Sequence, residues 1–600
     1  MVENAKRNYH RFRMRLRRKV RKQRHHVEDI SVQADDMLDK HVFRRFGHLV
    51  GVRRFVAAWV LLVFFVGLGA IWQVKSLDSF YLELVPTSGG VYREGMIGSF
   101  TTANPLFAVN DVDSSVSRLV FSGLFKIAPD GTLEPDLASS YEMNADGSEY
   151  VVHLKNDVKW QDGTQFTADD VVFTYDRIKN PEVKSPLFAG WSAIRIVARD
   201  PSTVVFLLPN TLSSFPFSMT NGIVPKHLLS SVPSVDLRSA TFNTAQPIGT
   251  GPFRFNKVEV LGNSIDERQE KVTLETYNAY HAKKPTIDGI TIRTFKDEDT
   301  MTAAFKKQEI AGMVGLETLR DDAEDTETVQ SFSTPHSGQV MVFLKNSNPI
   351  LSDVNVRKAL LRATDTNLLR EKIGYQLINS DSPFLKSHFT YDQAKVQLPF
   401  DKAEAEKLLD SAGWVRNAEG VREKDGQKLS LRLVSQSISE YATVAQGLQE
   451  QWGAVGVLVE AVLLPEEDVQ TGAIIQHDYD VLLYGVSLGP DPDVFAFWHS
   501  SQADARLKSR LNLAEYSSKA ADLSLESGRT RTNSELRKVK YGPFLDAWIA
   551  DVPAIALYQP RFLFVVRGTL EGYRSGQFTT AADRYYSIAD WQIRREKTVK

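Results

Sequence analysis

A short segment that follows a predicted strand contains the side chains that best suit the binding of a ligand. Residues 478–484 are rich in apolar and aromatic side chains, which predicts a strand. Residues 485–493 follow the carboxyl end of that strand. Hydroxyl, carboxylate and free backbone groups at such an end suit a ligand that carries an amine or other hydrogen-bond donors. The predicted contacts in this part of the chain are Tyr484, Ser487, Gly489 and Asp491.

Asp491 has a second interpretation. An Asp side chain can accept a hydrogen bond from the first free N–H groups of a helix, and proline suits a first helical turn. On that interpretation Asp491 caps a helix over residues 494–499, with Pro492 in its first turn, and affects binding only through the fold. Both interpretations stay open, and the cap is the plainer one. Phe107 and Trp191 are aromatic candidates for stacking on a ligand, although such residues more often belong to a core or an interface.

The chain lacks two of the short motifs that mark common enzymes. It contains no H-E-x-x-H and no G-x-x-x-x-G-K-[ST], and the G-x-S-x-G spacing occurs once, as GVSLG at residues 485–489. It has no cysteine, which excludes disulfides, Cys-ligated metals and cysteine nucleophiles, and its 12 histidines are scattered. We therefore predict no catalytic residues, no metal site and no cofactor.

Alternating and helical periodicities place the candidate loop on an α/β scaffold. Residues 429–434 and 457–463 read as strands, and residues 440–454 between them have a helical period. A strand–helix–strand unit of this length predicts a parallel pair joined by a right-handed crossover. Earlier in the chain, residues 150–154 read as a strand, and Thr167 with an acid three positions later predicts a capped helix.

One segment is apolar enough to cross a membrane. Residues 55–74 carry no charge, and their length matches a hydrocarbon core of about 30 Å. Trp59 and Trp72 lie near its two ends, where indole rings favour the interface. A signal peptide usually has a shorter apolar core and a shorter basic start, so we predict an uncleaved anchor with the basic side in the cytoplasm and the body outside.

Charge divides the chain in the same place. Residues 1–54 hold 16 Lys/Arg and 6 Asp/Glu, although the whole chain has a net charge of −2. The basic run at residues 6–24 is interpreted as a topology determinant that lies on anionic lipid head groups. Nucleic-acid binding is the sharper alternative, and it is disfavoured because no recognisable nucleic-acid fold surrounds the run.

Several ordered segments also resemble those of one protein family. They are PDLA at residues 135–138, WQDGTQFTADDV at 160–171, PKHLL at 225–229, GTGPF at 249–253 and VRKAL at 356–360. Their order is similar to that in the extracellular solute-binding proteins of peptide/nickel-type ABC importers. The loop at 485–493 resembles the family's cleft-facing "GWxxxxDPD" loop, and the "WHS" segment around Trp498 resembles a related subgroup, which adds Trp498 to the candidate contacts.

The resemblance implies a two-lobed, periplasmic-binding-protein-like α/β fold with an extra subdomain, preceded by one transmembrane helix. The implied organisation is a basic tail (1–54), a membrane helix (55–75), a connector (76–90), a first lobe (91–335) with a subdomain at about 126–245, a second lobe (336–558) and a return to the first lobe (559–600). It implies a protein that captures a solute, foremost a peptide, between its lobes and delivers it to an ABC permease served by separate ATPase subunits.

The resemblance has one departure and leaves two other functions open. Peptide binders of the family often hold the ligand's ammonium group with an acid in this loop, but here that place falls at Leu488 or Gly489, and Val486 replaces the usual Trp. A strict dipeptide or oligopeptide specificity is therefore not implied. The alternatives are a solute-binding sensor or scaffold that signals through its cytoplasmic tail, and a hydrolase built on this fold.

Overall fold

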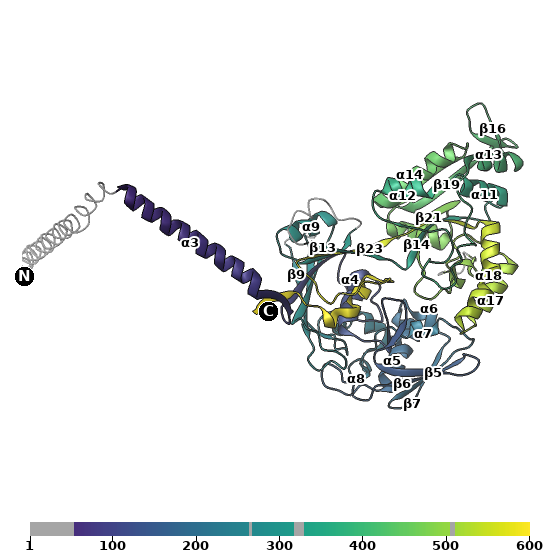
Figure 1. The fold of residues 1–600 in the computed structure, drawn as a ribbon. Coiled ribbons are helices and arrows are strands. Elements are labelled where there is room, and N and C mark those ends of the chain that lie inside the picture. Colours follow the sequence, from purple (N-terminus) through teal and green to yellow (C-terminus); the bar gives the residue numbers. More distant parts are fainter. Residues whose placement is uncertain (1–52, 263, 265–266, 317–328, 505–509, 600) are drawn as a thin grey trace, which may run out of the picture. The chain divides into compact units, whose positions relative to one another are not determined.

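The chain is described by a computed structural model over residues 53–262, 264, 267–316, 329–504 and 510–599. It divides into two compact units, residues 1–85 with 596–600 and residues 86–595. The larger unit contains two principal sheets (Figure 1). We refer to the part built on the seven-stranded sheet as the first lobe and to the part built on the six-stranded sheet as the second lobe.

The first lobe is built on a mixed sheet. Strand β2 lies in its middle and runs parallel to both neighbours, β12 and β11. The strands, in spatial order, are β13 (Val329–Pro335), β23 (Arg561–Arg567), β12 (Gly312–Leu316), β2 (Val91–Ile97), β11 (Gly289–Phe295), β10 (Gln269–Thr276) and β9 (Phe253–Leu261). Strand β23 comes from near the end of the chain and pairs antiparallel with β12 and β13.

The second lobe sandwiches its sheet between two helical layers. Its strands, in spatial order, are β15 (Ile378–Asn379), β22 (Ala554–Gln559), β14 (Gly338–Leu344), β21 (Val481–Ser487), β19 (Ser430–Gln436) and β20 (Leu458–Leu464). Strand β14 is buried along its whole length, and alternate side chains enter two different cores. Such a strand is covered on both faces, which explains its continuous apolar sequence.

The helices on the two faces of this sheet come from different parts of the chain. Helices α11 (Val354–Arg362), α13 (Lys402–Ser411) and α14 (Ser439–Gly453) pack in one core. Helices α17 (Lys519–Arg529) and α18 (Ser534–Asp551), which lie side by side, pack in the other (Figure 1). The predicted β–α–β unit is confirmed, since β19 and β20 are parallel and α14 connects them.

Smaller sheets extend the first lobe. One contains β5 (Ala138–Met143), β6 (Glu149–Leu154), β8 (Thr203–Leu207) and β7 (Arg195–Asp200), and a hairpin pairs β3 (Phe125–Ile127) with β4 (Leu133–Pro135). Helix α5 (Ala168–Lys179) begins as predicted: Thr167 is its N-cap, and the Asp170 carboxylate accepts the Thr167 N–H at 3.0 Å.

The remaining elements are short or peripheral. The helices are α4 (Asp111–Val120), α6 (Phe188–Trp191), α7 (Phe215–Ser218), α8 (Lys226–Leu229), α9 (Glu298–Lys306), α12 (Thr366–Ile373), α15 (Glu466–Asp468) and α16 (Phe495–Trp498). The 3-10 helices are η2 (Pro181–Val183), η3 (Ser234–Ser239), η4 (Thr241–Asn243), η6 (Ser500–Gln502) and η7 (Ala581–Asp590), and η5 (Val469–Ile474) is a π-helix. A small three-stranded sheet contains β16 (Val415–Arg416), β17 (Arg422–Lys424) and β18 (Gln427–Lys428).

The chain passes between the two principal sheets along two adjacent segments. Strand β13 leads to β14 through His336 and Ser337, and β22 leads to β23 through Pro560. The segments are hydrogen-bonded to each other, because the His336 N–H donates to Pro560 O at 3.0 Å and the Gln559 amide donates to His336 O at 2.8 Å. The two lobes are thus joined by a paired crossing.

The smaller unit contains helix α3 (Arg53–Tyr81) and most of a pair formed by β1 (Leu82–Thr87) and β24 (Arg594–Val599). By length and composition, residues Phe55–Gln73 can span a membrane, and this stretch is not buried inside the protein. Within the expected connector at 76–90, the helix continues to Tyr81 and strand β1 follows it. The predicted basic tail lies almost wholly outside the described residues.

Candidate functional site

A cavity of about 520 Å³ is walled by both lobes. The first lobe contributes the β3–β4 hairpin and residues around α7, and the second lobe contributes residues 387–389, residues 490–492 and the start of α18. Near this cavity the lobes touch: the Ser214 hydroxyl donates to the Asp493 carboxylate at 3.3 Å. A molecule held in the cavity would therefore contact both lobes.

The second-lobe wall contains a buried ion pair. Both Asp491 oxygens accept hydrogen bonds from the Arg537 guanidinium at 2.7 Å, and the two side chains are 9% and 5% exposed. Burial acts to lower the pKa of Arg537, but the hydrogen bonds and charge of Asp491 raise it above its usual value. The Asp491 carboxylate thus has a fixed bidentate partner, and the Phe389 ring lies 5.3 Å from the guanidinium carbon.

The alternative role predicted for Asp491 is wrong in this structure. Helix α16 starts at Phe495, and Asp491 instead accepts the Asp493 N–H at 3.0 Å. Asp493 is the residue whose carboxylate accepts the Phe495 N–H, at 3.3 Å. The Arg537 pair draws Asp491 away from the helix start, and Pro492 precedes the helix.

His388 supplies an acceptor on the same wall. Its Nε2 lies 2.9 Å from Gly489 O, and burial lowers the pKa of the ring, so the imidazole is neutral at pH 7. Because a carbonyl oxygen only accepts, the ring proton is assigned to Nε2 and Nδ1 is left as an acceptor. Nδ1 is buried and has no hydrogen-bond partner in the described part of the chain.

Other polar atoms at the cavity are also unmatched. The Gln577 amide nitrogen and the Ser213 hydroxyl have no partner among the described residues, and both residues line the cavity from the first lobe. With His388 Nδ1 they offer one donor, one acceptor and one group that can act as either. Buried polar groups normally find partners, so such a set is suited to a ligand with both amide N–H and carbonyl groups.

The structure shifts the boundary of the predicted binding loop. Strand β21 does not end at Tyr484 but continues to Ser487, which pairs with Gly338. Its neighbour β14 keeps the ladder intact to that point, so the loop begins at Leu488. The Tyr484 hydroxyl accepts a hydrogen bond from the Gln470 amide at 2.5 Å. Tyr484 and Ser487 do not line the cavity, and their ligand contact stays a prediction.

Gly489 and Asp491 belong to the cavity region. Gly489 has φ of 69°, a conformation that favours glycine, and its carbonyl holds His388. Its N–H donates to Ser337 O at 3.2 Å, which ties the loop to the crossing between the lobes. Asp491 lines the cavity directly.

The three predicted aromatic contacts are core residues here. Trp191 stacks on Tyr175 at 3.9 Å between ring centroids, and Trp498 stacks on Phe343 at 5.8 Å. Phe107 is 5% exposed and lies under the Arg238 guanidinium. In this structure the three rings pack against other side chains, and their contact with a ligand stays a prediction.

Sequence reasoning did not find His388, Arg537 or Gln577. These residues lie at least 40 positions apart in the chain and carry no shared motif. Only the packing of α18 and of the 577–579 segment brings them to one cavity. Within the described ranges, no group of three or more His, Asp or Glu residues could hold a metal ion.

The chain matches proteins of known kind over most of its length. A family model for the bacterial extracellular solute-binding proteins, family 5, matches residues 132–506. The oligopeptide-binding protein AppA of Bacillus subtilis is 27% identical over 536 residues, which cover 86% of this chain and 95% of that protein. The crystal structure of NikZ from Campylobacter jejuni in complex with Ni(L-His) has a TM-score of 0.69 and 28% identity, covering 84% of this chain and 99% of that one.

The structure of Bacillus subtilis AppA in complex with a nonapeptide has a TM-score of 0.70 at 24% identity, covering 85% of this chain and all of that one. The two principal sheets, their paired crossing and the cavity between lobes define a two-lobed binding protein of the periplasmic type. The chain belongs to the bacterial extracellular solute-binding proteins, family 5. The resemblance to solute-binding proteins of peptide/nickel-type ABC importers is confirmed.

Proposed function

We propose that this protein is a membrane-anchored, extracytoplasmic binding protein that captures a solute, foremost a peptide, and delivers it to an ABC permease with separate ATPase subunits. The observation that carries the proposal is the cavity of about 520 Å³ with walls from both lobes and unmatched polar atoms on each side. A peptide backbone offers the complementary N–H and C=O groups at regular spacing. The likeness to the oligopeptide-binding protein AppA supports the same class of solute.

The mechanism is closure of the lobes around the solute without covalent chemistry. The two crossing segments at His336–Ser337 and Pro560 are the positions where the chain can bend between the principal sheets. A ligand that contacts both walls stabilises the closed arrangement by its differential contacts with it. Gly489, whose φ of 69° favours glycine, sets the loop conformation in which its carbonyl oxygen holds the His388 ring on this wall.

The binding step is tested by filling the cavity. Ser387 is exposed and lines it, so Ser387→Trp should abolish peptide binding measured by calorimetry on the full chain in detergent. Ser411→Trp is the matched control, because Ser411 is also exposed but does not line the cavity. Equal peptide affinity in both variants would overturn the interlobe site. Mass spectrometry of solute that co-purifies with the wild-type chain would identify the native ligand class.

The anchor is tested separately. Helix α3 and the basic residues ahead of it support a single span with the amino terminus in the cytoplasm. Protease added to intact cells should remove the body and leave a small membrane-bound fragment. A mature protein that begins after residue 74 and is released from the membrane would contradict the anchor and leave the binding proposal intact.

A further inference from the structure

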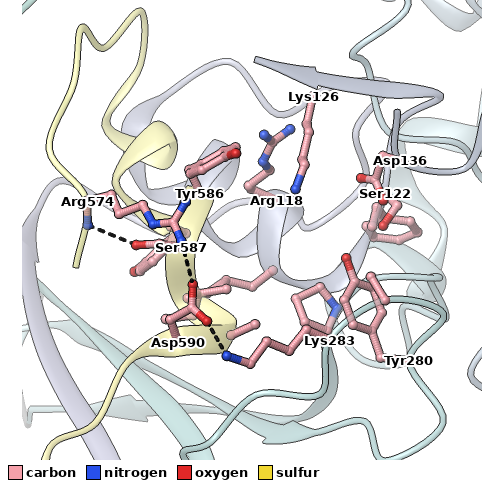
Figure 2. A pocket seen from close by; sticks show the side chains of 17 residues that line it. Arg118, Ser122, Lys126, Asp136, Tyr280, Lys283, Arg574, Tyr586, Ser587 and Asp590 are labelled. Atoms are coloured by element: carbon pink, nitrogen blue, oxygen red, sulfur yellow. Dashed lines mark hydrogen bonds and ion pairs between the residues drawn. The ribbon is translucent and has the colours of Figure 1, made fainter. Parts of the chain in front are cut away.

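A second, smaller pocket of about 190 Å³ lies within the first lobe (Figure 2). Helix α4 supplies Arg118, strand β3 supplies Lys126, and the turn after β10 supplies Lys283. Segment η7 and the residues before it supply Arg574 and Asp590. The pocket shares no lining residue with the interlobe cavity, so it is a separate place on the protein.

Cations outnumber acids around this pocket. Four basic side chains line it, against the carboxylates of Asp136 and Asp590. Asp590 is shared between Lys283 and Arg574, the latter at 3.7 Å, and Figure 2 draws both contacts. The Asp136 carboxylate contacts Nε2 of His281 at 2.8 Å, and His281 does not line the pocket. One acid between two cations leaves donor capacity on both.

Lys126 has a weak partner. Its ammonium lies 3.6 Å from the Glu134 carboxylate and 4.7 Å from the centroid of the Tyr586 ring. Glu134 in turn accepts a hydrogen bond from the Tyr586 hydroxyl at 2.7 Å. Counting Glu134 with the lining acids, the neighbourhood still carries one more cation than anions.

Arg118 is the unmatched group. It is half-buried, and no hydrogen bond or ion pair within the described residues reaches its guanidinium (Figure 2). Burial raises the pKa of the neighbouring Tyr280 well above its usual value, and the Arg118 charge opposes that rise. A guanidinium withdrawn from water without a partner costs free energy that an arriving anion would offset.

The wall opposite Arg118 is held in a fixed position. In η7, Arg584 and Tyr585 point inward to Glu94, whose side chain is fully buried, as is that of Arg584. Tyr585 and the next residues, Tyr586 and Ser587, line the pocket. A fixed wall facing a charged donor is a preorganised site.

We propose that this pocket is a second binding site, one that takes a small oxyanion such as a phosphate or carboxylate group, with Arg118 as its principal donor. The planar guanidinium fork matches the two oxygens of either anion, and Lys126, Lys283 and Arg574 add positive charge around it. The site acts independently of the solute cavity.

The test is calorimetry on the full chain in detergent, with inorganic phosphate and with succinate as separate probes in chloride buffers of matched ionic strength. We expect saturable binding of at least one probe, weakened by added salt. Phosphate binding alone would assign the site to phosphate, and succinate binding alone would assign it to carboxylates. Saturable binding of neither probe would overturn the proposal.

Arg118→Gln should weaken that binding by about tenfold or more, because it removes a charged hydrogen-bond donor. Arg195→Gln is the matched control, since Arg195 is exposed and lies outside the pocket. The melting temperature of Arg118→Gln without anion should equal or exceed that of the wild type. If Arg118→Gln does not fold, Lys126→Gln takes its place. Wild-type anion affinity in folded Arg118→Gln would overturn the role of Arg118, and wild-type affinity in Lys126→Gln would overturn this pocket as the anion site.

Discussion

Each lobe contains an arginine–carboxylate pair, and the two pairs differ in their surroundings. In the first lobe, Glu94 and Arg584 are both 0% exposed, with Nη2 and Oε2 2.6 Å apart. Ser115 accepts a further hydrogen bond from Arg584 at 3.0 Å, and the Tyr585 hydroxyl bonds to both partners. In the second lobe, Asp491 and Arg537 are 9% and 5% exposed and line the interlobe cavity.

The difference shows how one interaction can serve two ends. The Glu94–Arg584 pair is closed by its own network, so it has nothing to offer a ligand and its role is to fix η7 on strand β2. The Asp491–Arg537 pair leaves the Arg537 Nε without a partner among the described residues, and it borders open space. We infer that the first pair holds the fold and that the second holds the wall of a site.

The largest effect is expected when the sealed pair is broken. Glu94→Gln leaves the Arg584 cation without its counter-charge in the core, and should lower the free energy of unfolding by about 3–5 kcal/mol. Urea unfolding of the full chain measures this. Glu419→Gln is the control, since its pair with Lys428 is exposed and should contribute little. Equal losses in the two variants would show that the sealed pair is not a special determinant of stability.

Removing both charges should restore part of that loss. Glu94→Gln combined with Arg584→Met leaves no buried cation, so the double variant should be more stable than Glu94→Gln alone. The double-mutant coupling should be about 1–3 kcal/mol. Urea unfolding of the two single variants and the double variant completes the cycle. Additive losses would contradict the inference that the cost comes from an uncompensated charge.

Breaking the cavity pair should have a smaller effect on stability and a larger one on binding. Asp491→Asn removes a charged acceptor from Arg537 and should cost about 1.5–3 kcal/mol, because water in the cavity can reach the exposed part of the guanidinium. Peptide affinity, measured by calorimetry, should fall in this variant and stay unchanged in Glu94→Gln. The reverse pattern of affinities would exchange the roles assigned to the two pairs.

The smallest expected effect concerns pH. Burial lowers the pKa of His388 in the folded state, whereas in the unfolded chain the pKa of this histidine is about 6.5. As pH falls below that value the unfolded chain takes up a proton that the folded state resists, so stability falls, by at most about 1.4 kcal/mol per pH unit. His388→Gln should flatten the dependence of urea midpoint on pH below 6.5. His336 is present in both the wild type and the His388→Gln variant. Parallel curves of urea midpoint against pH for the two proteins would therefore exclude a contribution of His388 to the pH dependence of stability.

Local sequence predicted the structure reliably where residues close together in the chain specify an element by themselves. The β19–α14–β20 unit was predictable because apolar period and segment length together specify a parallel pair. The cap of α5 was predictable because Thr167 and Asp170 satisfy each other three positions apart. The extent of β21 was not, since Ser487 belongs to the strand only because Gly338 lies beside it in the sheet.

The candidate site was only partly predictable, for a related reason. The loop at 488–491 follows a strand end and could be located, but the partner of Asp491 lies 46 residues away on α18. The aromatic residues Trp191 and Trp498 could not be assigned from sequence, because a ring that fills a core and a ring that stacks on a ligand have the same identity.

By itself the sequence determined the α/β class, the family through its ordered motifs, and the existence of an apolar segment long enough for a membrane. These three properties depend on the periodicity, order and composition of residues, which can be read directly from the linear sequence. Only the tertiary structure decided which arginine is matched and which is not: Arg584 and Arg537 are paired with carboxylates, and Arg118 is not, within the described residues. The physical reason is that ion pairs and hydrogen-bond networks form between distant segments, whose separation in space is set by packing.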